Sequence, residues 1–162
     1  MNFEYELKAI QRFIKTTAGL NSWRRTAMPP KLARPVVLWE SPYSGRTQHI
    51  SRWSYRQNKK YYGKLYVNDV TECITLQETL ICGLEDLCGV LPVLDNDGKR
   101  VGWIRDAVFE FNDASDTLEI PFTLSYEVAY ERQKPEAPPA PRVIGTKVTV
   151  NNIDQEGENY GE

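Results

Sequence analysis

Residues 118–131, LEIPFTLSYEVAYE, carry an apolar side chain at every even position and a polar or small one at every odd position. A period of two held over this length predicts one β-strand with a buried face and a solvated face. At about 3.3 Å per residue the strand would extend roughly 45 Å, whereas typical strands have about five or six residues. Pro121 has no amide hydrogen, so we expect it at a sheet edge or past a bulge.

Two other segments follow the period of a helix. Residues 2–18 have one apolar face and are followed by Gly19, a common helix terminator, which predicts a first helix. A second helix is predicted from Thr75, whose spacing to Glu78 matches a capping box, up to Gly89. The apolar stripe expected on this second helix consists of Leu76, Leu80, Ile81, Leu84, Leu87 and Cys88.

The remaining apolar and alternating segments predict shorter strands. These strands cover residues 35–40, 49–57, 60–67 and 101–111. Turn-forming residues fill 41–48 and 112–116, and a hairpin is expected across Asn58 and Lys59. This order of elements predicts an α+β fold, with a mostly antiparallel sheet, two helices packed on one face and a long C-terminal β-hairpin.

The chain is expected to divide near residue 131. Residues 1–131 contain all the helices and strands above and have the size of one domain. Residues 132–162 comprise a proline-rich linker, a β-prone arm at 142–150 and an acidic tail. Because proline favours an extended chain, this part predicts an extended C-terminal arm.

Charge is unevenly distributed along the chain. Residues 1–64 have 13 Lys and Arg against 3 Asp and Glu, or +10, whereas residues 65–162 have 7 against 19, or −12. Part of the positive charge lies in a long loop predicted at residues 20–34. Three arrangements fit this asymmetry: nucleic-acid contact by the basic half, association of copies through opposite charges, or a fold that interleaves the two halves.

Residues typical of catalysis or metal binding are few. His49 is the single histidine, and no nucleophile motif, phosphate-binding loop or zinc-ligand spacing occurs. Cys73, Cys82 and Cys88 are expected to be free thiols, with Cys82 and Cys88 as small core residues. The sequence favours a protein that is not an enzyme and needs no metal or cofactor. The acidic N-terminus and the short apolar segments predict a cytoplasmic chain without membrane contact.

Residues 50–64, ISRWSYRQNKKYYGK, interleave basic and aromatic side chains. On strands, such a pattern is able to form a stacking platform for nucleic acid. It also fits aromatic side chains that face the helices while the basic ones face solvent. A small basic and aromatic nucleic-acid-binding module is therefore the alternative to the function considered next.

The order and size of these segments resemble the tail terminator, or tail completion, proteins of tailed bacteriophages. The segments that carry the resemblance, within residues 3–131, are ELKAIQRFI, ARPVVLWE, RWSYRQNKKYYGKLYV, TLQETLICGLEDL and VGWIRDAVFEF–NDASD–TLEIPFTLSYEVAYE. Members of this family form a ring, usually six-fold, on the last ring of the tail tube. There they end tube growth and present a docking face to the head-completion complex, and in contractile tails a related ring also meets the sheath.

The resemblance implies a structural protein of the virion tail or neck that is assembled in the bacterial cytoplasm. Its partners would be copies of itself, the tail tube protein, a head-completion or neck protein and, in a contractile tail, the sheath protein. DNA would be only a passing cargo.

Within such a ring, three groups of side chains are candidates for contacts with neighbours. The basic candidates, expected to meet carboxylates of the next subunit or of the tube end, are Arg24, Arg25, Lys31, Arg34 and Arg46. The acidic candidates, expected to face a lumen or a neighbour, are Glu119, Glu127 and Glu131. The arm candidates, expected to add a strand to an adjacent subunit or to the next neck protein, are Val143, Ile144, Val148 and Val150.

Overall fold

The computed structural model describes residues 3–113 and 118–131, without the side chains of residues 41–44. The elements in chain order are α1 (Phe3–Ala18), β1 (Asn21–Arg24), the 3-10 helix η1 (Arg25–Ala27), β2 (Val36–His49), β3 (Ser54–Tyr66), α2 (Val70–Asp86), β4 (Leu91–Leu94), β5 (Arg100–Phe111) and β6 (Glu119–Glu131). The strands form one sheet in the order β1-β2-β3-β6-β5-β4.

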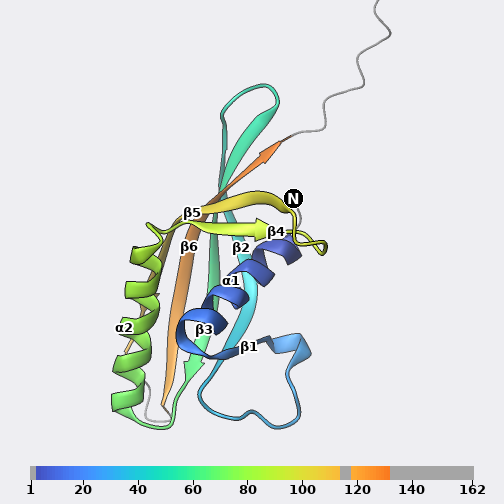
Figure 1. Ribbon diagram of the computed structural model, residues 1–162. Coiled ribbons are helices and arrows are strands. Elements are labelled where there is room, and N and C mark those ends of the chain that lie inside the picture. Colours follow the sequence, from blue (N-terminus) through green and yellow to red (C-terminus); the bar gives the residue numbers. More distant parts are fainter. Residues whose placement is uncertain (1–2, 114–117, 132–162) are drawn as a thin grey trace, which may run out of the picture.

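The predicted α+β fold is confirmed. Strands β1 and β2 pair in parallel, and all the other pairs are antiparallel. In Figure 1 the sheet is strongly curled, α1 crosses in front of it and α2 runs along one side. The hydrophobic core lies between the helices and the facing side of the sheet. The arm expected at residues 132–162 lies outside the described residues.

The first long hairpin differs from the prediction. The sequence predicts a turn at residues 41–48, whereas β2 runs through them, and β3 continues without interruption through Asn58. Two register shifts in the β2–β3 ladder accommodate Pro42 and Gly45 within the strand. A Cβ atom on Gly45 would lie 2.9 Å from the backbone oxygen of Asn58, so this close approach requires glycine. The chain turns instead at residues 50–53, and this end of the hairpin projects beyond the helices (Figure 1).

Strand β6 confirms the period of two. Its even-numbered side chains from Ile120 to Val128 are buried, and the odd-numbered side chains between them are half-buried. The strand is nevertheless central, between β3 and β5, so the sheet edge, one of the two positions expected for Pro121, is wrong. The carbonyl of Pro121 accepts a hydrogen bond of 2.9 Å from the N–H of Asn112, just after β5 ends at Phe111. The nitrogen of Pro121 faces β5, like its carbonyl, but lies beyond the last paired residue of β5. Proline is therefore tolerated there, because no ladder hydrogen bond requires its missing N–H.

Helix α1 buries the predicted apolar face, but α2 begins earlier than the capping-box spacing predicts. Asp69 is the N-cap residue, and its carboxylate accepts a hydrogen bond of 2.7 Å from the N–H of Glu72. The Glu72 carboxylate in turn accepts a hydrogen bond of 2.7 Å from the N–H of Asn68. Thr75 therefore lies inside the helix. The expected stop at Gly89 is confirmed, since it has a φ of +67° and donates to a carbonyl of the last turn.

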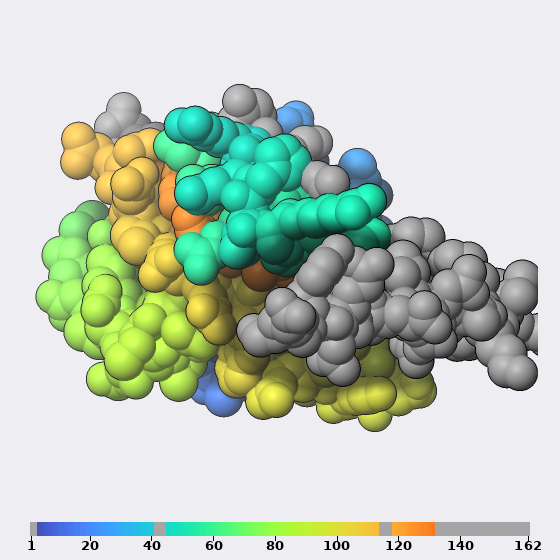
Figure 2. Space-filling model, turned by 90° about the horizontal axis from the view of Figure 1, so that it is seen from above, coloured from blue at the N-terminus to red at the C-terminus, as the bar shows by residue number. Residues whose placement is uncertain are grey.

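Only part of the apolar stripe predicted on α2 is buried. Leu80 and Leu84 are in the core, whereas Ile81 is 41% exposed. Cys82 and Cys88 are also exposed, so their expected place in the core is wrong, although both thiols and that of the buried Cys73 are free as predicted. The helix packs through a narrow side that contains Gly83, where a Cβ atom would lie 2.4 Å from a methyl group of α1. Much of the rest of α2 is exposed, and Figure 2 shows it on one flank of the molecule.

Candidate assembly surfaces

The basic segment, defined as residues 21–34, connects α1 to β2. It was predicted as a loop but contains β1 and η1. Arg24 Nη1 lies 3.8 Å from a carboxylate oxygen of Glu4, and its guanidinium carbon lies 5.6 Å from the centre of the Phe3 ring. Arg24 is thus held by α1 of its own chain. Contact between Arg24 and a neighbouring subunit would have to compete with this ion pair.

The other basic candidates in this segment divide into two kinds. Arg34 donates a hydrogen bond of 2.9 Å to the carbonyl of Val67 and lies over the ring of Tyr66, at 5.4 Å. It therefore ties the segment to the end of β3. Arg25 and Lys31 are exposed and form no ion pair within the described part of the chain. These two cations are the ones most available to a partner.

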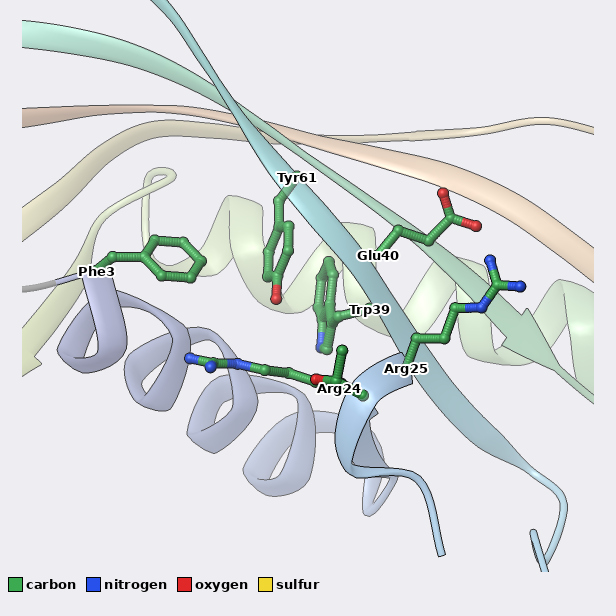
Figure 3. A pocket seen from close by; sticks show the side chains of 7 residues that line it. Phe3, Arg24, Arg25, Trp39, Glu40 and Tyr61 are labelled. Atoms are coloured by element: carbon green, nitrogen blue, oxygen red, sulfur yellow. The ribbon is translucent and has the colours of Figure 1, made fainter.

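A pocket of about 530 Å³ opens between the basic segment, α1 and the sheet. Figure 3 shows the side chains that line it, which include Phe3, Arg24, Arg25, Trp39, Glu40 and Tyr61. The Trp39 and Tyr61 rings are stacked, with their centres 4.4 Å apart. Burial raises the pKa of the Tyr61 hydroxyl to about 12, an effect that the nearby Arg24 guanidinium reduces.

Trp39 gives this pocket an unusual polar feature. The residue is fully buried, and its Nε1 hydrogen has no hydrogen-bond partner in the described part of the chain. In Figure 3 the nitrogen end of the indole points towards Arg24. A buried donor without a partner is energetically costly. The pocket therefore offers aromatic surface and cationic donors, a combination that suits an oxygen acceptor from a partner.

The outer face of the sheet, on the side away from the helices, carries ion pairs between β3 and β6. Glu119 lies 3.4 Å from Lys64, and Glu127 lies 3.7 Å from Arg56. Two of the acidic candidates are thus paired within their own chain, while Glu131 is exposed at the end of β6. This pairing shows that the fold interleaves the basic and acidic halves at this face.

The inner face of the same two strands holds a buried ion pair that sequence reasoning missed. Lys59 Nζ lies 2.9 and 2.8 Å from the two carboxylate oxygens of Glu6, and the two residues are 5% and 0% exposed. The Tyr126 hydroxyl donates to Glu6 across 3.2 Å, and the Tyr130 hydroxyl contacts both charged groups. Each charge therefore has several polar partners, which is the condition for keeping an ion pair buried.

A sequence signal for this cluster exists. Glu6 falls three residues after Phe3 and four before Ile10, which places a carboxylate on the apolar face of the first helix. Lys59 was assigned to a turn, although it continues the alternation of Tyr61 and the rest of β3. A charge on each of two apolar faces predicts a buried pair once the two elements are known to be adjacent.

The remaining candidates either lie apart from these surfaces or lie outside the described residues. Arg46 is exposed on β2 and joins none of the ion pairs above. Val143, Ile144, Val148 and Val150 lie outside the described residues. The structure thus brings Arg24 and Arg25 together at one pocket, and it places Glu119 and Glu127 on another surface.

The aromatic residues of the proposed nucleic-acid platform are also partly used by the fold. Tyr61 is buried in the core, and Tyr55 stacks on Tyr130 with ring centres 5.3 Å apart. Tyr62 on the outer face is 41% exposed. Basic side chains of this face do point outward, but Arg56 and Lys64 have carboxylate partners.

Within residues 3–113 and 118–131, no group of three or more His, Cys, Asp and Glu side chains is placed to hold a metal ion. No helix of the described part has the length and apolar character needed to cross a bilayer. Comparison of the chain with protein-family models and with curated proteins found no match.

Proposed function

We propose that the chain is a structural virion protein that forms a ring, in the simplest case a hexamer, at the head-proximal end of a phage or phage-like tail. There it ends growth of the tail tube and joins the tail to the head-completion or neck proteins. Its partners are copies of itself, the tail tube protein and, where the tail is contractile, the sheath protein. DNA passes the ring as cargo.

The observation that carries this proposal is the size and exposure of the central strands. Strands β2, β3 and β6 have 14, 13 and 13 residues, about twice the usual strand length. Both helices lie on the other side, so the outer face of β3 and β6 remains a broad, polar surface. Such a surface suits the wall of a ring, where it would face either the central lumen or a neighbouring subunit. Its mixed charges would give passing DNA little net attraction, because phosphate affinity comes chiefly from Lys and Arg.

The direct test is to delete the gene from the phage or phage-like element that encodes the chain. We expect tail tubes of irregular, excessive length and tails that fail to join heads, and both defects should be restored by supplying the chain in trans. Labelling of complemented particles should place the chain at the head-proximal tail end. Normal, head-joined tails in the deletion strain would rule out this function.

A DNA-binding titration at several salt concentrations distinguishes the proposed function from the alternative, nucleic-acid binding. A binding module should bind DNA tightly at low salt, and its affinity should fall steeply as the salt concentration rises. The pairing of Arg56 and Lys64 with carboxylates favours weak binding instead. Tight, steeply salt-dependent binding by the purified chain, together with no effect of its deletion on tails, would favour the alternative.

A further inference from the structure

Helix α2 presents an acidic and apolar stripe to solvent. Its residues are spaced by four, four, three and four, which places them on one side of a helix. This stripe, termed the α2 face, consists of Val70, Ile74, Glu78, Ile81 and Glu85. The three apolar members are 59%, 53% and 41% exposed in chain order. Large apolar side chains gathered on one exposed side are typical of interaction surfaces.

The charge of α2 has a single sign. The helix contains four carboxylates and neither Lys nor Arg. Glu72 is used at the helix start, but Glu78 and Glu85 are exposed and form no ion pair within residues 3–113 and 118–131. The α2 face therefore combines uncompensated negative charge with apolar area.

The basic segment has the complementary composition. It contains four Lys and Arg residues and neither Asp nor Glu. Trp23 and Met28 are 41% and 47% exposed, and the exposed cations Arg25 and Lys31 follow each of them within three positions of the sequence. A segment that exposes apolar side chains and cations is complementary to a helix face that exposes apolar side chains and carboxylates.

The first part of the basic segment, β1 and η1, lies apart from α2 on one subunit, whereas Arg34 at its end reaches Val67 near the start of α2. In Figure 1, α2 runs along the left side, and the connection from β1 to β2 lies at the lower right. The fold thus holds α2 and β1 apart within one chain, and a second copy brings the two surfaces together. Contact between two different surfaces of identical subunits is heterologous, and such contacts generate a closed ring when the rotation between copies permits.

We propose that the α2 face of one copy docks on the basic segment of the next copy, in a head-to-tail contact. The inference deepens the proposed ring function by naming the two surfaces that join its subunits. Burial of Ile74 and Ile81 against Trp23 and Met28 supplies the apolar part of the contact. The opposite charges fix which surfaces meet and speed their encounter.

Charge reversal tests this pairing in the full-length chain. One variant carries Glu78→Lys with Glu85→Lys, and a second carries Arg25→Glu with Lys31→Glu. Sedimentation at high protein concentration and low salt should show self-association of the unaltered chain, and each variant should weaken it at least about tenfold through like-charge contact. The changes lie at exposed positions, so the thermal melting of each variant checks that the fold persists.

Mixing the two variants provides the decisive comparison. In the mixture, each reversed surface meets a complementary partner, so association should return in alternating order. A chain that carries all four reversals should also associate with itself. The matched control reverses Arg12→Glu and Asp97→Lys, two exposed charges outside both surfaces, and should associate like the unaltered chain.

A cross-link locates the contact. Cys82 is an exposed thiol on α2 next to the α2 face, so Met28→Cys together with Cys88→Ser should allow a short bifunctional thiol reagent to join Cys82 of one copy to residue 28 of the next. Covalent oligomers are expected, and the Glu78→Lys with Glu85→Lys changes should prevent them. A chain that stays monomeric at every concentration, or variants that associate normally alone, would overturn the inference.

The outcomes separate this inference from the proposed function. Head-to-tail association without any effect of gene deletion on tails would leave the contact standing and remove the function. Normal tail termination by a chain with either charge reversal would leave the function standing and overturn the contact.

Discussion

Lys59 and Lys60 are adjacent in the sequence and lie on opposite faces of β3. Lys59 is 5% exposed, and its ammonium group contacts the buried Glu6 carboxylate at 2.8 Å. Lys60 is exposed and forms no ion pair in the described part of the chain. The same contrast separates the inner ion pair from the outer pairs that join β3 to β6, such as Arg56 with Glu127 at 3.7 Å.

This comparison shows that the face of a strand, rather than residue type, sets the energetic role of a charge. The inner pair has lost its hydration, so each charge depends on its partner and on the two tyrosine hydroxyls. The outer pairs remain in water, where the attraction is screened and contributes roughly 0–1 kcal/mol. We therefore expect the inner face to govern stability and the outer face to be available for contacts with other subunits.

The largest effect should follow from Glu6→Ala, which leaves the Lys59 ammonium buried without its counter-charge. Loss of one partner of a buried pair is expected to reduce the free energy of unfolding by about 3–5 kcal/mol. Denaturant unfolding of the purified chain measures this change in the free energy of unfolding. Glu4→Ala, on the exposed side of the same helix, is the matched control and should change stability by less than about 1 kcal/mol. Equal effects of the two changes would contradict burial of the Glu6 charge.

A second prediction separates charge pairing from packing. Glu6→Leu combined with Lys59→Met replaces the pair by apolar side chains, and the double variant should be more stable than either single variant. The reason is that neither charge is left unpaired, although the tyrosine hydroxyls lose an acceptor. A double-mutant cycle in denaturant measures this coupling, and additive losses would show that the two groups act independently.

Alkaline pH should lower the free energy of unfolding because of the buried tyrosines on the inner face. Burial first, and contact with Glu6 second, raise the pKa of Tyr126 and Tyr130 above the usual value, and burial raises the pKa of Tyr61 to about 12. In the unfolded chain these hydroxyls ionise near pH 10. Since the unfolded state then releases protons that the folded state keeps, the free energy of unfolding should fall as the pH rises above about 10.

Unfolding measured between pH 8 and pH 12 tests this dependence, and Tyr61→Phe should make the decline shallower because one of the shifted groups is removed. The phenyl ring keeps the stacking on Trp39, so the variant should remain folded. An identical decline in Tyr61→Phe and in the unaltered chain would argue against a raised pKa at this position.

The smallest effect should come from the outer ion pairs. Arg56→Ala removes one partner of Glu127 and should lower the free energy of unfolding by at most about 1 kcal/mol, with less effect at high salt. Lys64→Ala should behave in the same way towards Glu119. A loss comparable to that of Glu6→Ala would show that this surface is more deeply buried than its exposure indicates.

Local patterns were sufficient for the parts of the fold that depend on one element at a time. The alternation of 118–131 predicted β6 and its buried face, and the spacing of Leu7, Ile10 and Ile14 predicted α1. Prediction failed where a residue type is common in two kinds of local structure. Pro42 and Gly45 are common in turns, but bulges in the β2–β3 ladder hold both within a strand.

The candidate surfaces were predicted only in part for the same reason. The basic character of residues 20–34 could be read from composition, whereas the pairing of Arg24 with Glu4 depends on the position of α1 beside that segment. The stripe on α2 was expected to be entirely core, because periodicity identifies an apolar side but not how much of it a neighbour covers. Helix α2 approaches α1 closely at Gly83, so the contact between the two helices is narrow. Ile74 and Ile81 lie outside this contact.

Hydrophobic period and turn chemistry act over a few neighbouring residues, so they were enough to predict the helices, most strands and the α+β class. Only the three-dimensional arrangement shows that Glu6 meets Lys59, 53 positions away, and that buried Trp39 has no partner for its indole nitrogen among the described residues. It also decided that α2 and β1 lie on different sides of the subunit (Figure 1). Burial, pairing and orientation depend on which elements become neighbours in space, and no local pattern contains that information.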